Sequence, residues 1–404
     1  MTTTDHANYQ AYLASVYPGT KWTLSMLSGG MVNTTMRATR ASHTEEPVDA
    51  PPSLILKHAR PYVQSEGPEF TFSIRRQAVE AAMLDLVQAD YGPAKYMSKE
   101  ERQKHFPCLL RHDYGTESSL HLTQQSLEAS ILLIADLGPL ENCLEFLENN
   151  ATTLPINEVA SIGATIGTIL AGFHTTKLLN PPEILKNDMT HEVIFLVAVE
   201  PLKGQLAHLP NGAQLYNRIE EDFARPKYEY PKVLSHGDFH SGSVLIPEGS
   251  SSEAYPIVID MEFSQLRGRG VNGDMAHFFA SIHCGLIAAE TSGDATVASV
   301  ISCFIGSLCA AYQSGSVMEF CRRGDDIGAQ LLRSAFILHG QEVINYAHDF
   351  CEDKGHAAKM TQVGVWYIER AGDDVEAFLD ETNWGRMGEE HGMVIQSLFK
   401  EVHR

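Results

Sequence analysis

The chain has 404 residues, a formal net charge of −21 and a hydrophobic content of 44%. This length suits one two-lobed unit or two to three domains. So acidic a chain repels phosphate backbones, which argues against nucleic acid as a partner. No run approaches the roughly 20 apolar residues of a membrane span, so we expect no membrane association.

The amino terminus and the cysteines indicate the compartment. Residues 1–6 have neither the basic start nor the apolar core of a secretory signal. The seven cysteines are scattered, odd in number and free of any C-x-x-C pattern. Cys303 and Cys309 fall in an apolar helical stretch, where buried free thiols are ordinary. We therefore expect a reduced, cytoplasmic protein, present as a monomer or a homodimer.

Residues 1–137 are predicted to form an N-terminal, nucleotide-binding lobe of mixed strand and helix. Short apolar runs separated by turns predict strands at 22–27, 33–38, 53–57 and 131–134. A polar, proline-bearing stretch between the second and third strands is typical of a long hairpin loop. Apolar residues at helical spacing predict a helix over 72–88.

The turn at 28–35 is a candidate phosphate-covering loop. Gly29 and Gly30 would let backbone N–H groups approach a polyanion, and the short polar side chain of Asn33 would cap the turn. Paired glycines are also common in ordinary turns, so this motif is weak by itself.

Lys57 strengthens the nucleotide hypothesis. It ends an apolar strand downstream of the glycine turn, a position suited to pairing the α- and β-phosphates. The alternative is a strand-end lysine whose ammonium group reaches solvent. Glu80, on the next predicted helix, would hold Lys57 in place, unless it forms a surface pair with Arg76 instead.

A break in the chain follows the apolar run 131–134, and we interpret it as the hinge between two lobes. Ala135 and Leu137 in this break are further candidate nucleotide-binding residues. The remainder, 138–404, is predicted to be a mainly helical catalytic and substrate-binding lobe. Its expected helices are 157–174, 274–290, 296–312, 327–350 and 360–379, with a last helix within 383–404.

The segment 236–245, His-Gly-Asp-Phe-His-Ser-Gly-Ser-Val-Leu, carries the strongest chemical signal. It contains Asp238, and 22 residues further on an apolar run leads to Asp260 and Glu262. Phosphoryl transfer needs one carboxylate to accept a hydroxyl proton, and others to hold Mg²⁺ on the nucleotide phosphates. We therefore predict ATP and Mg²⁺ as ligands, Asp238 as the catalytic base, Asp260 as the main metal ligand and Glu262 as the second.

Two neighbouring features allow other interpretations. His236 and His240 flank Asp238 at a spacing that also suits zinc, but no third protein ligand follows at a known spacing. A loop histidine that hydrogen-bonds the backbone and orients Asp238 is the preferred alternative. Asp274 immediately precedes a predicted helix, where an aspartate is a common N-cap.

The segment 236–245 resembles the catalytic loop of the aminoglycoside phosphotransferase-like and choline kinase-like small-molecule kinases. Ser243 and the later Asp260-Met261-Glu262 are similar to the pattern of the methylthioribose kinase group, where most relatives carry Asn and a different metal motif. The resemblance implies an α+β, bilobal protein-kinase-like fold, with an antiparallel sheet in the small N-terminal lobe. It also implies that Ser243 joins the metal site and that Asp274 ties the metal loop to the next helix.

The acceptor implied by the resemblance is a small hydroxylated molecule. A methylthioribose-like sugar comes first, although the arginine pair expected near the C-terminus is replaced by a single Arg370. The segments 27–33 and 53–59 are similar to fungal 4-hydroxytryptamine kinases, which makes a hydroxylated indolethylamine the second acceptor. An aminoglycoside-type amino sugar is third. A nucleotide-binding protein without turnover is the alternative from another class, and a metal hydrolase is more remote.

Overall fold

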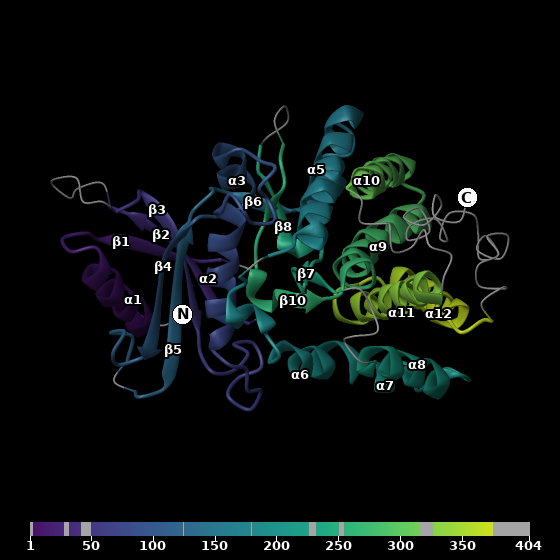
Figure 1. Ribbon diagram of the computed structural model, residues 1–404, viewed down its shortest axis with the longest axis horizontal. Helices are drawn as coiled ribbons and strands as arrows, with labels where there is room; N and C mark the ends of the chain where they lie inside the picture. Colours follow the sequence, from purple (N-terminus) through teal and green to yellow (C-terminus); the bar gives the residue numbers. More distant parts are fainter. Residues whose placement is uncertain are drawn as a thin grey trace. The chain divides into compact units, whose positions relative to one another are not determined.

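A computed structural model of the protein describes residues 3–27, 32–41, 50–123, 125–178, 180–225, 232–249, 254–315 and 326–374 (Figure 1). The chain divides into two compact units, the first formed by 1–89 with 99–138 and the second by 90–98 with 139–404. The first contains an antiparallel sheet and the second is mainly helical, which confirms the predicted α+β class.

The first unit is built on a sheet in which every described pairing is antiparallel. Among the described residues, the strand order is β1-β2-β3-β5-β4. The strands are β1 Trp22–Met26, β2 Thr34–Arg40, β3 Ser53–Ala59, β4 Leu109–Thr116 and β5 Glu128–Ala135. β3 and β5 are neighbours, with Lys57 paired to Leu132, and their apolar side chains are largely buried as expected for central strands.

Three helices of the first unit are described: α1 Thr3–Val16, α2 Arg75–Gln88 and α3 Lys99–His105. α1 contributes Tyr12 and Leu13 to the same buried cluster as Trp22 and Leu133 of the sheet. α2 packs against β4 and β5. It buries three polar side chains together with its apolar ones, namely Arg76, Gln77 and Glu80. These buried polar groups position the candidate nucleotide-binding residues.

The second unit combines helices with two small antiparallel sheets. Its longer helices are α4 Cys143–Asn149, α5 Ile156–Thr175, α8 Gly212–Ala224, α9 Ala276–Ser292, α10 Ala295–Ser314, α11 Asp326–Asp349 and α12 Lys354–Arg370. One sheet has the order β6-β8-β9, formed by Leu140–Asn142, Val244–Pro247 and Ile257–Val258. The other pairs β7 Val233–Ser235 with β10 Gln265–Gly268. The predicted helix at 360–379 begins earlier, at Lys354, and the predicted helix within 383–404 lies outside the described residues.

α5 and α10 form a close helix pair because small residues line their contact. A Cβ atom on Gly163 would lie 2.5 Å from the Phe304 carbonyl oxygen, and one on Gly167 would lie 2.3 Å from the Leu308 carbonyl oxygen. By length and composition alone both helices are apolar enough to cross a membrane, which the sequence did not lead us to expect. In the structure the apolar window is 50% buried in α5 and 39% buried in α10.

Candidate active site

Lys57 forms a buried ion pair with Glu80. Its Nζ lies 2.7 Å and 2.8 Å from the two Glu80 carboxylate oxygens, and the residues are only 4% and 2% exposed. Gln77 of the same helix donates to the Lys57 carbonyl oxygen at 3.0 Å. The alternative of a lysine that reaches solvent is therefore wrong, and α2 fixes both the backbone and the ammonium group of Lys57.

Arg76 binds the start of β2, so the alternative of a surface Arg76–Glu80 pair is also wrong. Its guanidinium group is fully buried and donates to Asn33 Oδ1 at 3.0 Å and 3.2 Å. The Phe72 carbonyl accepts a further hydrogen bond from Arg76 at 2.8 Å. Asn33 is thus held by α2, while Gly29 and Gly30 lie outside the described residues.

The predicted hinge is an ordered turn. Ala135 still pairs with Leu54, and its N–H donates to the Cys108 carbonyl at 2.9 Å, so this N–H is used within the sheet. Asp136 follows, and its carboxylate binds the Arg37 guanidinium at 2.9 Å and the Gly138 N–H at 3.0 Å. Leu137 lies between them, half-buried.

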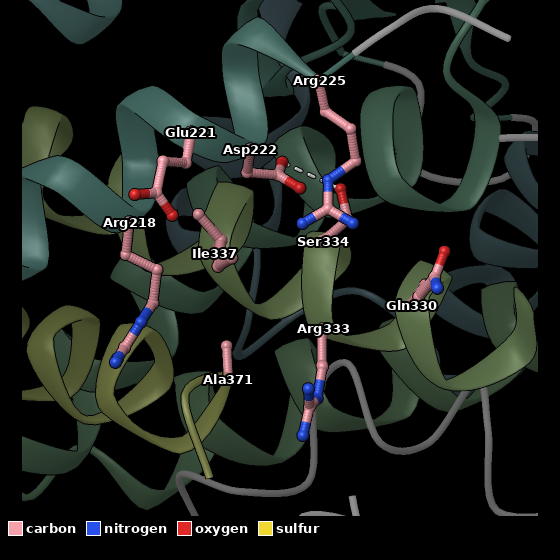
Figure 2. A pocket seen from close by; sticks show the side chains of 9 residues that line it. All are labelled: Arg218, Glu221, Asp222, Arg225, Gln330, Arg333, Ser334, Ile337 and Ala371. Carbon is pink, nitrogen blue, oxygen red and sulfur yellow. Dashed lines mark hydrogen bonds between the residues drawn. The ribbon is translucent and has the colours of Figure 1, made fainter. Parts of the chain in front are cut away.

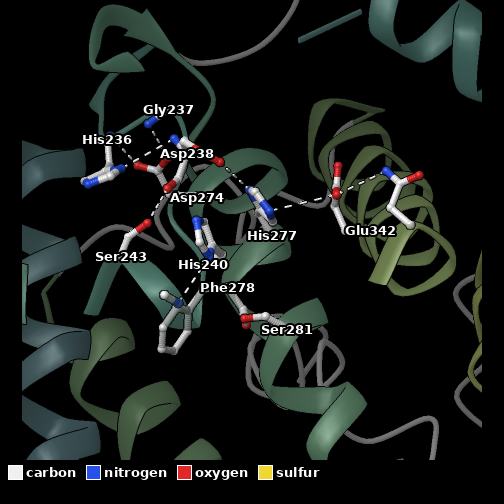
Figure 3. Close-up of polar contacts among 12 residues, drawn as sticks. His236, Gly237, Asp238, His240, Ser243, Asp274, His277, Phe278, Ser281 and Glu342 are labelled. Atoms are coloured by element: carbon white, nitrogen blue, oxygen red, sulfur yellow. Dashed lines mark hydrogen bonds and ion pairs between the residues drawn. The ribbon is translucent and has the colours of Figure 1, made fainter. Parts of the chain in front are cut away.

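The loop between β7 and β8 carries Asp238, and Asp274 holds its backbone. The Asp274 carboxylate accepts the N–H groups of His236 at 2.7 Å and Gly237 at 2.9 Å (Figure 3). His174 Nε2 lies 3.1 Å from the same carboxylate, and Tyr312 supports the other ring nitrogen at 2.6 Å. Asp274 does not cap α9, because the N-cap residue of this helix is Met275 and no side chain caps it. The Asp274 carboxylate binds the backbone of the Asp238 loop instead.

Direct contacts join the Asp238 loop to the segment that carries Asp260 and Glu262. His236 Nε2 lies 2.8 Å from the Ile259 carbonyl oxygen, and the Ile259 N–H donates to the Ser243 carbonyl at 3.0 Å. Gly237 has φ +91°, and a Cβ there would lie 2.1 Å from the Phe263 carbonyl oxygen. The structure thus brings together two short segments that are 22 residues apart in the chain.

The side chain of Asp238 is partly exposed to solvent, and its backbone is held by a hydrogen bond. Its side chain is 38% exposed. Its carbonyl oxygen accepts a hydrogen bond from the Ser243 hydroxyl at 2.7 Å. Ser243 is fully buried at the end of a short 3₁₀ turn, Ser241–Ser243. The hydroxyl proton of Ser243 is therefore committed to the loop, which leaves the lone pairs of its oxygen for a metal.

Asp260 and Glu262 offer the donor chemistry that Mg²⁺ prefers. Asp260 is half-buried and adopts the left-handed conformation with φ +59°, which is uncommon for a residue with a side chain. Glu262 is 5% exposed in the turn Met261–Phe263, where Asn187 binds its carbonyl oxygen at 3.1 Å. Across the residues that the structure describes, no three acidic, histidine or cysteine side chains cluster as a metal cage. Mg²⁺ on a nucleotide takes most of its ligands from phosphate and water, so two carboxylates fit it.

Both histidines of the loop hydrogen-bond backbone groups, one in the neighbouring segment and one in the loop itself, which agrees with the preferred interpretation. His236 binds the Ile259 carbonyl, and His240 accepts the Gly242 N–H at Nδ1 with a separation of 3.1 Å. Burial lowers the pKa of His240, because the imidazolium form loses its hydration.

A neighbouring pair, His277 and Glu342, was missed by the sequence reasoning. His277 Nδ1 lies 3.7 Å from Asp238 Oδ1, and its Nε2 lies 3.9 Å from Glu342 Oε2 (Figure 3). His277 follows Asp274 by three residues, so its closeness to Asp274 in the sequence could have drawn attention to it. Glu342 lies on α11, and no local pattern connects it with the catalytic loop.

A separate cavity of about 290 Å³ opens between α8 and α11 (Figure 2). Arg218, Arg225 and Arg333 line it together with Glu221 and Asp222. Two of these arginines serve the end of α12: Arg218 donates to the Ile368 carbonyl at 2.7 Å, and Arg333 donates to the Asp373 carbonyl. None of the predicted site residues lines this cavity.

No family model matches the sequence, and no curated protein shows significant sequence similarity to it. Solved structures do match over most of their length. A choline kinase from Cryptosporidium parvum is 11% identical with a TM-score of 0.48, covering 94% of this chain and 99% of that one. A microcompartment-associated aminopropanol kinase is 12% identical with a TM-score of 0.48, covering 92% and 98%. An ethanolamine kinase from Plasmodium vivax is 13% identical with a TM-score of 0.40, covering 87% and 81%. At these values the function has to be inferred from the residues of the chain itself.

Proposed function

We propose that the protein transfers the γ-phosphate of ATP to a hydroxyl group of a small molecule. The observation that carries this proposal is the attachment of the Asp238 loop to the segment bearing Asp260 and Glu262. The proposed base and the two proposed Mg²⁺ ligands thus come from two segments of the second unit that contact each other. In the first unit, the buried Lys57–Glu80 pair supplies a fixed ammonium group suited to nucleotide phosphates.

Asp238 acts as the base in this proposal. The acceptor oxygen forms a bond to the γ-phosphorus while the bond from that phosphorus to the β,γ-bridging oxygen breaks, and ADP leaves. The hydroxyl proton passes to the Asp238 carboxylate, which orients the hydroxyl and takes its proton late. Asp260 and Glu262, with the oxygen of Ser243, would hold Mg²⁺, whose charge offsets that of the phosphates.

We propose a first choice of acceptor and an alternative. Ser243 and the Asp260-Met261-Glu262 motif support a methylthioribose-like sugar as the first choice. A hydroxylated amine, either an indolethylamine or an amino sugar, is the alternative, and the formal net charge of −21 is compatible with a cationic acceptor. We place the reaction in the cytoplasm, consistent with free thiols at the described cysteines, which are Cys108, Cys143, Cys284, Cys303, Cys309 and Cys351.

The test is an ATP-consumption screen over hydroxylated metabolites, including methylthioribose, 4-hydroxytryptamine and amino sugars. Asp238→Asn serves as the matched control, because the amide can hold the hydroxyl but cannot take its proton. We expect this variant to bind Mg·ATP normally and to lose at least ~10²-fold in kcat. Near-normal kcat would remove Asp238 from the mechanism. Mg·ATP binding without turnover on any acceptor would favour a non-catalytic nucleotide-binding protein.

A further inference from the structure

His277, in the first turn of α9, lies between two carboxylates that come from distant parts of the chain. Its Nδ1 faces Asp238 Oδ1 at 3.7 Å, and its Nε2 faces Glu342 Oε2 at 3.9 Å (Figure 3). These separations are those of ion pairs rather than hydrogen bonds. Contacts in a substrate-free catalytic site are commonly long and tighten when the substrate binds.

Glu342 is held in place by its neighbours on α11. Gln341 donates to Glu342 Oε1 at 2.8 Å, and Asn345 approaches Oε2 at 3.3 Å while it also donates to the Ala198 carbonyl at 3.0 Å. Burial raises the pKa of the Glu342 carboxyl, and the charge of His277 opposes that rise. A carboxylate in so enclosed a place is costly unless a cation faces it, and His277 is placed to be that cation.

Two other described histidines near His277 do not supply a positive charge. His240, on the catalytic loop, has its ring centre 5.6 Å from that of His277, and burial lowers its pKa. His339, on α11, lies 3.4 Å from the Ala276 carbonyl, and burial lowers its pKa to about 3. Both rings are therefore neutral near pH 7. The charges that face His277 among these described groups are the carboxylates of Asp238 and Glu342.

We propose that His277 is a positioning residue for Asp238 and that Glu342 holds His277 in place. This inference rests on the proposed phosphoryl transfer. His277 would engage Oδ1 of Asp238 and leave the other carboxylate oxygen to accept the proton of the substrate hydroxyl. No proton leaves His277 in this step, because the hydroxyl proton ends on Asp238.

The kinetic test compares kcat and the KM for ATP in His277→Gln, Glu342→Gln and the double variant. We expect His277→Gln to lower kcat by ~10- to 10²-fold at neutral pH, a loss typical of a disturbed acid–base group. The KM for ATP should stay within about twofold, because His277 faces Asp238 rather than the proposed nucleotide-binding residues. Glu342→Gln should act in the same direction. The double variant should be no worse than His277→Gln, because Glu342 acts through His277.

His348→Gln is the matched control, since His348 forms an exposed pair with Asp349 on the same helix at 2.9 Å. It should leave kcat and the KM for ATP unchanged. Thermal unfolding of every variant checks that the fold is retained, and His277→Asn replaces any His277→Gln protein that does not fold. Additive losses in the double variant, or a KM for ATP that rises as far as kcat falls, would overturn the positioning role.

A readout without turnover separates this inference from the proposed function. At one fixed pH, the ring resonances of His277 should change position in Asp238→Asn and in Glu342→Gln, because each change removes a charge that faces the ring. Resonances that are unaffected by both changes would refute the contact itself. Failure of every acceptor in the ATP screen would instead overturn the proposed function.

Discussion

One carboxylate, that of Asp274, holds the conformation of the catalytic loop. It is 2% exposed, so its charge needs compensation from partners rather than from water. Two backbone N–H groups of the loop and the ring of His174 provide it. At the residue scale, the candidate site therefore depends on a buried carboxylate that forms hydrogen bonds with several groups at once.

Ser243 is the residue whose role the structure makes most testable. Ser243→Ala removes the hydroxyl that donates to the Asp238 carbonyl. Leaving that acceptor unsatisfied should cost ~1–3 kcal/mol of stability and lower kcat. The Mg²⁺ concentration at half-maximal rate should also rise if the Ser243 oxygen contacts the metal. Ser241→Ala, in the same turn, is the control. A lower kcat with an unchanged Mg²⁺ dependence would make Ser243 a brace of the loop alone.

Asp260 and Glu262 can be compared through charge-neutral variants. Asparagine tolerates the left-handed conformation of Asp260, so Asp260→Asn removes the charge with little backbone strain. It should raise the Mg²⁺ requirement more than Glu262→Gln does, because Asp260 closely follows β9 and is half-buried, whereas Glu262 is only 5% exposed. Titrations of rate against Mg²⁺ decide the question. Identical curves for the wild type and both variants would reject these metal ligands.

At the scale of elements, the catalytic loop relies on a close approach of two backbones. Gly237→Ala would place a Cβ 2.1 Å from the Phe263 carbonyl oxygen, at a positive φ as well. The loop must shift, and we expect kcat to fall by at least ~10²-fold, as for other misplaced catalytic groups. Gly249→Ala is a matched control, with φ +74° but no atom within 4 Å of its Cβ. Equal kcat in the two variants would show that the close approach does not position Asp238.

The pair between β3 and α2 is the second element-scale feature. Glu80→Gln would leave the buried Lys57 ammonium without this carboxylate, which should cost ~3–5 kcal/mol in the free energy of unfolding and raise the KM for ATP. The double variant Lys57→Met/Glu80→Gln should regain much of the stability, because no unpaired charge stays buried. It should not regain the ATP affinity, because the ammonium group of Lys57 is missing. Urea unfolding and ATP titration measure the two effects. Glu183→Gln, which removes an exposed pair with Lys186, should change stability by no more than about 1 kcal/mol.

At the scale of the whole molecule, buried neutral histidines make stability depend on pH. Burial lowers the pKa of His58 and of His339 to about 3, from an ordinary value of 6.5. Below pH 6.5 the unfolded chain binds protons that the folded protein does not. The stability that these groups contribute is therefore present above pH 6.5 and is lost as the pH falls toward 3.

We accordingly expect the free energy of unfolding to fall between pH 7 and pH 5, by up to about 1.4 kcal/mol per pH unit for each histidine. His339→Asn should reduce this slope by the contribution of one proton, whereas the exposed His348→Gln should leave it unchanged. Urea unfolding at several pH values gives the slopes. The same slope in the wild type and His339→Asn would contradict the assignment.

Local patterns in the sequence predicted much of the architecture. The helical spacing at 157–174 and 296–312 corresponds to α5 and α10, and the small residues of α5 allow their close packing. The contact of Lys57 with Glu80 was also predicted, because Glu80 lies on the helix that follows the strand of Lys57. Neither α1 nor β4 was predicted. In β4 the reason is that the strand has little apolar periodicity and its residues are at least partly exposed.

The segment 236–245 was singled out from the sequence alone, because its candidate base and histidines lie in adjacent residues. The resemblance also implied a tie through Asp274, 36 residues beyond Asp238 in the chain. Only the tertiary structure showed which backbone groups Asp274 binds, and that Glu342, 104 residues beyond Asp238, faces His277. Local spacing is set by backbone geometry between near neighbours and is visible in the sequence. Contacts between distant segments depend on how helices such as α9 and α11 pack, and that packing is settled only when the whole core forms.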